Sequence, residues 1–77
     1  MRRAIKMICT ATISGYVAEI VGVDTSQKTR LFFGQVYAEG KRYDEVWNEQ
    51  GEALSAQASP FFDVQSYLLK SYSVKRD

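Results

Sequence analysis

The stretch TRLFFGQVYAEGKRYDEVW, residues 29–47, decides the fold that we predict for this chain. Apolar and polar residues alternate through residues 29–38 and again through residues 41–48. A period of two with aromatic and branched side chains is typical of β-strands. Glu39 and Gly40 lie between the two runs and predict a tight hairpin. Gly34 falls in mid-strand, where glycine weakens a strand or marks a bulge or a close approach between backbones.

Alternation also separates the side chains of this hairpin into two faces. One face of its first strand is predicted to carry Leu31, Phe33, Gln35 and Tyr37. The opposite face is predicted to carry Arg30, Phe32, Gly34 and Val36. In the second strand Tyr43 and Trp47 share one side, with Glu45 between them. Alternation alone leaves open whether that side is the core or an exposed surface.

Two runs before the hairpin add further strands. Residues 4–13 alternate, with Ile5, Met7 and Cys9 on the apolar side. Residues 16–23 read as a strand whose two faces are both mostly apolar. A short helix over Tyr16–Val21 remains an alternative, because periodicity cannot settle the structure of a short apolar run.

The chain after the hairpin predicts a turn, a short strand and a helix. Asn48–Gly51 has the composition of a type I turn followed by a left-handed glycine, and residues 52–54 would return as a fifth strand. Ser59 as N-cap and Pro60 at the first helical position predict a helix over residues 60–71. The residues with the spacing of one helical face are Phe61, Val64, Leu68 and Tyr72.

Together these elements predict one α+β domain over residues 1–77. Its architecture would be an antiparallel β-meander of four to five strands with one C-terminal helix packed on one face. A chain of 77 residues has room for one small domain of this kind.

The composition argues against an enzyme. The chain has no histidine and a single cysteine, so neither a Ser–His–Asp nor a Cys–His arrangement can form. The usual ligands of structural zinc are also missing, and we expect no metal and no cofactor. Cys9 lies on the apolar side of its strand and is expected to be a buried free thiol. The carboxylates of Asp44, Glu45, Glu49 and Glu52 are expected to be solvated surface charges.

The expected location is the cytoplasm. A single cysteine allows no internal disulfide, whereas small domains of oxidising compartments usually carry several. Arg2 and Arg3 before an apolar stretch could indicate a secretory signal, but Lys6 interrupts that stretch. No segment approaches the roughly 20 apolar residues of a membrane span, so no membrane partner is expected.

Nucleic-acid binding is an alternative function with limited support from charge. Ten basic residues offset nine acidic ones, which leaves a net charge of +1. Strong binders of phosphate backbones usually carry a larger basic excess. Aromatic residues nevertheless interleave with basic ones around the hairpin, and exposed rings on a sheet can stack on bases.

Protein–protein contact is the function that the sequence favours. The chain lacks catalytic parts, 13% of its residues are aromatic, and one helix would leave one sheet face uncovered. The predicted partner-binding residues are Arg30, Phe32, Arg42, Tyr43 and Trp47, a set rich in the types that dominate interfaces. The partner would be a host or assembly protein. A second copy of the chain is an alternative, because small domains often gain stability as two-fold dimers.

In size and style the chain resembles the small accessory proteins that phages and plasmids encode to block host machinery, including anti-CRISPR proteins. The similarity lies in a small, histidine-free sheet domain that ends in one helix. It implies a stoichiometric inhibitor that binds a host protein complex and occludes it.

Overall fold

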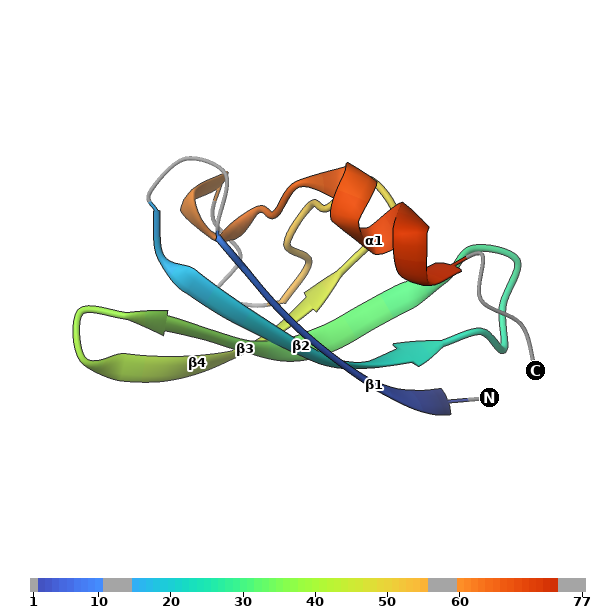
Figure 1. Cartoon of the computed structure of the whole chain (residues 1–77), viewed down its shortest axis with the longest axis horizontal. Coiled ribbons are helices and arrows are strands. Elements are labelled where there is room, and N and C mark those ends of the chain that lie inside the picture. Colours follow the sequence, from blue (N-terminus) through green and yellow to red (C-terminus); the bar gives the residue numbers. More distant parts are fainter. Residues whose placement is uncertain (1, 11–14, 56–59, 74–77) are drawn as a thin grey trace.

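The computed structural model describes residues 2–10, 15–55 and 60–73, and it shows four antiparallel strands in one open sheet (Figure 1). The strands are β1 (Arg2–Thr10), β2 (Val17–Asp24), β3 (Leu31–Ala38) and β4 (Lys41–Trp47). They lie in the order β1-β2-β3-β4, so each strand pairs with its neighbour in sequence. The predicted meander is confirmed, and β2 is a strand where the sequence left a helix as an alternative.

The β3–β4 hairpin turns through two residues with positive φ. Glu39 has φ 52° and Gly40 has φ 76°, and the strands stay in register from Ala38↔Lys41 to Phe32↔Trp47. Two-residue turns with positive φ match the right-handed twist of the strands that they join. The tight hairpin predicted from the sequence is confirmed.

The sheet bends where β1 and β2 each carry an irregularity. The register shifts between Ala4 and Met7 in the β1–β2 pair and between Ile20 and Gly22 in the β2–β3 pair. Gly34 lies opposite Ile20, and a Cβ at Gly34 would clash with the carbonyl oxygen of Glu19. Gly34 therefore marks a close approach of two backbones beside a bulge, one of the readings that the sequence allowed.

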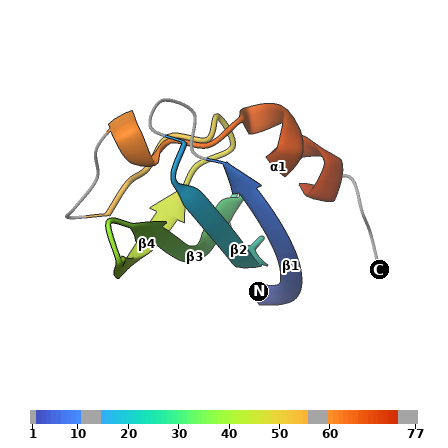
Figure 2. The ribbon, with the colours of Figure 1, turned by 60° about the vertical axis from the view of Figure 1, so that its left-hand side comes forward.

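One face of the sheet forms the core, and we call it the inner face. Its buried residues in the strands are Met7, Cys9, Ala18, Ile20, Val23, Phe32, Val36, Ala38, Glu45 and Trp47. Phe62, Val64 and Leu69 from the C-terminal segment belong to the same cluster. Figures 1 and 2 show this segment on one side of the sheet only. The molecule thus has two layers, a sheet and a partly irregular cover.

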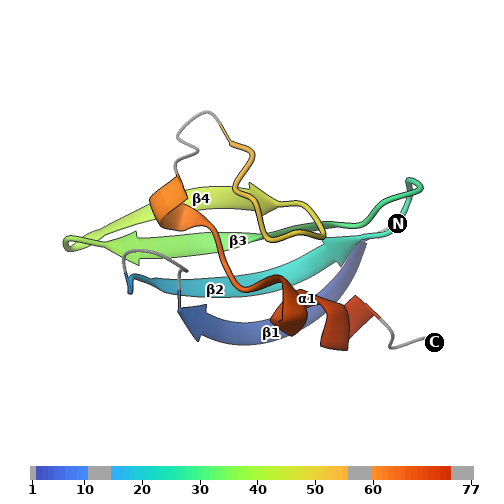
Figure 3. The ribbon, with the colours of Figure 1, turned by 90° about the horizontal axis from the view of Figure 1, so that it is seen from above.

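The cover differs from the single helix predicted over residues 60–71. Pro60–Phe62 forms one turn of 3-10 helix, η1, and the α-helix α1 spans only Ser66–Ser73. Figure 3 shows η1 and α1 separated along the sheet. Phe61, predicted to face the core, is 52% exposed, whereas its neighbour Phe62 is buried. The predicted face is therefore wrong at Phe61, whereas Val64 is buried and Leu68 packs against the core as predicted.

Tertiary hydrogen bonds explain why residues 62–64 do not continue a helix. The Trp47 Nε1–H donates to the Phe62 carbonyl at 2.9 Å, in the buried interior. The Val64 N–H donates to the Gly51 carbonyl at 2.9 Å, and the Asp63 carboxylate accepts the Ala53 N–H at 2.9 Å. Backbone groups of Phe62 and Val64 thus find hydrogen-bond partners far away in the sequence, so they do not need the partners that a continuous helix would supply.

The predicted fifth strand is reduced to one bridge. Gly51 has φ 85°, as expected for the left-handed glycine of the turn, and the chain then runs back beside β4. Only Trp47 and Ala53 form a bridge, while the Leu54 N–H donates to the Val46 carbonyl at 2.7 Å. The Ala53 N–H donates to the Asp63 carboxylate and the Ser55 N–H to the Glu45 carboxylate, so these two groups do not continue a backbone ladder with β4.

Some predictions lie outside the described part of the chain. These are the strand positions Ala11 and Ile13, the N-cap at Ser59 and the side chain of Tyr72. Within the described residues, no helix combines the length and apolar character needed to cross a membrane.

Candidate functional site

The face of the sheet opposite the core carries no described segment, and we call it the outer face (Figure 2). Residues that alternate with the buried positions, or lie directly opposite one another across strands, share this face. Its members include Lys6, Ile8, Val17, Glu19, Phe33, Gln35, Tyr37, Arg42, Asp44 and Val46. The outer face is the candidate functional site because it is the broad surface that the fold leaves accessible.

Three exposed apolar side chains lie next to one another on the outer face. Ile8 is 67% exposed, Val17 46% and Tyr37 40%. Val17 and Tyr37 are direct cross-strand partners, and Ile8 on β1 is diagonal to Val17 because it pairs with Glu19. We call these three residues the apolar patch. It joins β1, β2 and β3 at the end of the sheet near the Glu39–Gly40 turn.

Glu19 organises the polar groups beside the apolar patch. Its Oε2 lies 3.6 Å from the Lys6 Nζ, and its Oε1 accepts the Tyr37 hydroxyl at 3.1 Å. The hydrogen bond to Glu19, together with partial desolvation and the carboxylate charge, raises the pKa of Tyr37 above its usual value. The Tyr37 hydroxyl thus serves as a hydrogen-bond donor to Glu19.

The five residues predicted to bind a partner do not lie together on one surface of the structure. Arg42 lies on the outer face opposite Tyr37 and is exposed, as the prediction requires. Phe32 and Trp47 are fully buried in the core. Neither can contact a partner of the folded domain, so the structure removes both from the predicted contact surface.

Tyr43 and Arg30 are also not brought together with Arg42. Tyr43 points to the inner face, where its ring centroid lies 5.5 Å from that of Phe62. Arg30 precedes β3 at the end of the sheet remote from Tyr37, and its Nε lies 2.8 Å from the Glu49 Oε2. The Arg30 N–H also donates to that oxygen at 3.1 Å. Arg30 thus fastens a loop to the turn that follows β4.

Sequence reasoning missed the apolar patch, although part of the signal was present. Alternation placed Ile8 opposite the apolar side of its strand and Tyr37 on the same side as Phe33. It could not say which side of each strand would be covered. Aromatic and arginine content instead drew attention to Phe32 and Trp47, whose size makes them the largest fully buried side chains.

Glu45 corrects the expectation that the hairpin carboxylates are all solvated. It is 2% exposed, and its carboxylate accepts the Ser55 N–H at 2.8 Å and the Ser55 hydroxyl at 2.9 Å. The Val46 N–H adds a third bond at 3.2 Å. A buried carboxylate needs such donors to offset lost hydration. Glu45 therefore holds residue 55 against β4.

The described residues show no cluster of possible metal ligands. They contain no group of three or more His, Cys, Asp or Glu side chains that could hold a metal ion. Cys9 is a free buried thiol, as predicted, and burial raises its pKa. A thiol in this state is a poor nucleophile.

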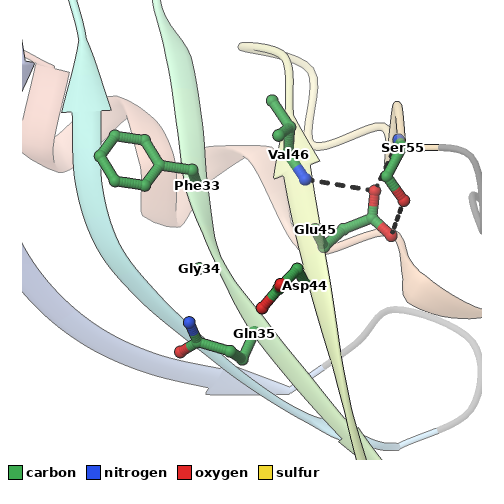
Figure 4. Close-up of a pocket in the computed structure, with 7 residues that line it drawn as sticks. All are labelled: Phe33, Gly34, Gln35, Asp44, Glu45, Val46 and Ser55. Carbon is green, nitrogen blue, oxygen red and sulfur yellow. Dashed lines mark hydrogen bonds between the residues drawn. The ribbon is translucent and has the colours of Figure 1, made fainter.

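A shallow groove of about 300 Å³ crosses the sheet from β3 to the edge of β4 (Figure 4). It is lined by Phe33, Gly34, Gln35, Asp44, Glu45, Val46 and Ser55. Figure 4 shows the Glu45 carboxylate turned to Ser55, while the side chains of Asp44 and Gln35 lie on the other side of β4.

Comparisons of the chain with protein-family models, with curated proteins and with solved structures found no match.

Proposed function

We propose that this chain is a non-enzymatic protein–protein interaction module that binds its partner through the outer face. The observation that carries the proposal is the apolar patch of Ile8, Val17 and Tyr37 on a face without a described cover. Clustered apolar side chains with a polar rim are typical of interaction sites. Lys6, Glu19 and Arg42 supply that rim, and Arg and Tyr are residue types enriched among binding hot spots.

The particular role that we propose is inhibition by occlusion in the cytoplasm. A small phage- or plasmid-encoded protein of the anti-CRISPR kind needs only one stable surface that covers a functional surface of a host complex. The outer face of this sheet could serve as that surface, and occlusion of a host complex needs no catalytic groups. The chain's resemblance to such accessory proteins in size and style supports this role.

Charges on the outer face favour a protein partner over a nucleic acid. Glu19 lies beside Lys6, and Asp44 lies two residues from Arg42 on the same strand and face. Acidic groups among the basic ones weaken the positive potential on which phosphate binding depends. Mixed charges of this kind instead provide specificity for a complementary protein surface.

The test compares two substitutions of equal exposure on opposite sides of the molecule. Ile8 on the outer face is 67% exposed, and Tyr67 on α1 is 68% exposed. Tagged wild type, Ile8→Glu and Tyr67→Glu are used to capture proteins from the source lysate with and without nuclease, and the captured protein is then purified for calorimetry. We expect Ile8→Glu to weaken that binding at least about tenfold, the cost of losing one well-buried contact at an interface. Tyr67→Glu should bind like wild type.

Other outcomes would count against the proposal in distinct ways. Bands that vanish with nuclease would indicate a nucleic-acid-binding module. Loss of binding in Tyr67→Glu alone would move the contact to α1. A wild-type chain that sediments as a dimer, and an Ile8→Glu chain that sediments as a monomer, would assign the apolar patch to a homodimer.

A further inference from the structure

The groove over β3 and β4 has an apolar row and a polar row. Phe33 and Val46 are direct cross-strand partners, and so are Gln35 and Asp44 in the next outward-facing row. The two pairs are two residues apart along each strand and all four side chains line the groove, so the rows form its adjacent halves. A ligand that fills both must combine an apolar stem with a polar head.

Asp44 is the outer-face carboxylate that the described fold leaves without a partner. Glu19 is engaged by Lys6 and Tyr37, and the buried Glu45 is engaged by Ser55. Among the described residues, the Asp44 carboxylate makes no hydrogen bond or ion pair, and no lysine or arginine lines the groove. The charge of the groove therefore attracts a cation.

We propose that this groove binds a single arginine side chain presented by the protein partner. The three-carbon stem of the arginine lies along Phe33 and Val46, and the guanidinium reaches Asp44, with the Gln35 carboxamide oxygen as a second acceptor. A carboxylate accepts the planar guanidinium through two parallel hydrogen bonds, a geometry that an ammonium does not match. The groove volume of about 300 Å³ leaves room for one arginine side chain.

This inference rests on the proposed function, since it specifies the chemistry of the same partner on the same face. The apolar patch lies at one end of the outer face, and the groove lies beside it over β3 and β4. The partner surface would therefore be apolar where it meets Ile8 on β1 and would carry an arginine where it meets Asp44 on β4, three strands away.

The test uses a small probe and the isolated chain, so that it does not depend on capture of the partner. Butylguanidinium is titrated into isotope-labelled protein, and amide shifts are followed by NMR. Butylurea has nearly the same shape but no charge and serves as the control probe. We expect saturable shifts at residues 33–35 and 44–46 with millimolar affinity for butylguanidinium, and none for butylurea.

Two variants identify the carboxylate. Asp44→Asn should weaken butylguanidinium binding about threefold to fivefold, the range expected for one exposed ion pair. Glu39→Gln removes the same charge from the exposed hairpin turn and should leave the affinity unchanged. Equal binding of butylurea, unaltered affinity in Asp44→Asn, or the absence of saturable shifts at these residues would each overturn the inference. A negative result here combined with an Ile8→Glu binding defect would leave the proposed function standing.

Discussion

Gly34 is the residue at which the sheet has no room for a side chain. Its Cβ position coincides with the backbone of β2 at Glu19 and Ile20, beside the bulge in that strand. Neither strand can move away easily, because each is paired on both sides. Glycine at this position is thus required by a contact between backbones rather than by its own φ.

Substitution Gly34→Ala should destabilise the domain by about 3 kcal/mol or more, because overpacking against backbone cannot be relieved by a rotamer change. Urea unfolding followed by far-UV circular dichroism measures the change. Gly40→Ala is the matched control: Gly40 has φ 76° but nothing within 4 Å of its Cβ position. It should cost only about 1–2 kcal/mol of left-handed strain. A Gly34→Ala cost no larger than that of Gly40→Ala would contradict the close backbone approach.

Among the elements, the C-terminal cover formed by residues 60–73 depends on hydrogen bonds to the rest of the chain more than on helix propensity. The α1 helix has only eight residues, a length that is marginal in isolation. Trp47, Gly51 and Ala53 bond to residues 62–64 and fix the segment that leads into α1. Leu69 then reaches the core from α1 itself.

Substitution Trp47→Phe should cost about 2–3 kcal/mol, because it leaves the buried Phe62 carbonyl without its donor and removes ring volume. Phe61→Ala should cost less, no more than about 1 kcal/mol, because the Phe61 side chain is 52% exposed and lies outside the buried core. Both changes are measured by urea unfolding followed by circular dichroism. Tryptophan fluorescence is not suitable, because Trp47 is the chain's single tryptophan and one variant removes it. A large loss of stability in Phe61→Ala would show that Phe61 packs in the core, as the sequence predicted.

At the scale of the whole molecule, one core joins the sheet to its cover. Cys9 belongs to this core although it lies on the edge strand β1. Its thiol can meet a reagent only when β1 or the cover opens. A domain of this size buries a modest fraction of its surface and therefore has a small margin of stability. The rate at which the Cys9 thiol becomes accessible reports on that margin.

We expect Cys9 to react with a disulfide reagent at pH 8 at least about 100-fold more slowly in the native chain than in urea. Burial blocks access and raises the pKa of the Cys9 thiol above its usual value, which lowers the thiolate fraction at that pH. The double variant Cys9→Ala, Gln27→Cys places a thiol in the exposed loop after β2 and should react rapidly without urea. Equal native rates for the two thiols would show that β1 separates readily from the core.

Most of the sheet could be predicted because strand signals are local. Alternation in residues 29–47 and the Glu39–Gly40 turn specify β3, β4 and their register, since the two-residue turn allows one pairing. The inward positions of Ile5, Met7 and Cys9 follow from the same period. The candidate site was predicted poorly, because only Arg42 of the proposed contact residues lies exposed on the outer face.

The sequence by itself determined four strands, their order and the two sets of side chains on the sheet, because a strand's period is a property of its own backbone. The tertiary structure alone decided which set is buried. That choice depends on where residues 60–73 lie, and contacts remote in sequence place them: Trp47 with Phe62, and Gly51 with Val64. The tertiary structure likewise shortened the helix, placed Glu45 in a buried position bonded to Ser55, and left Ile8, Val17 and Tyr37 exposed.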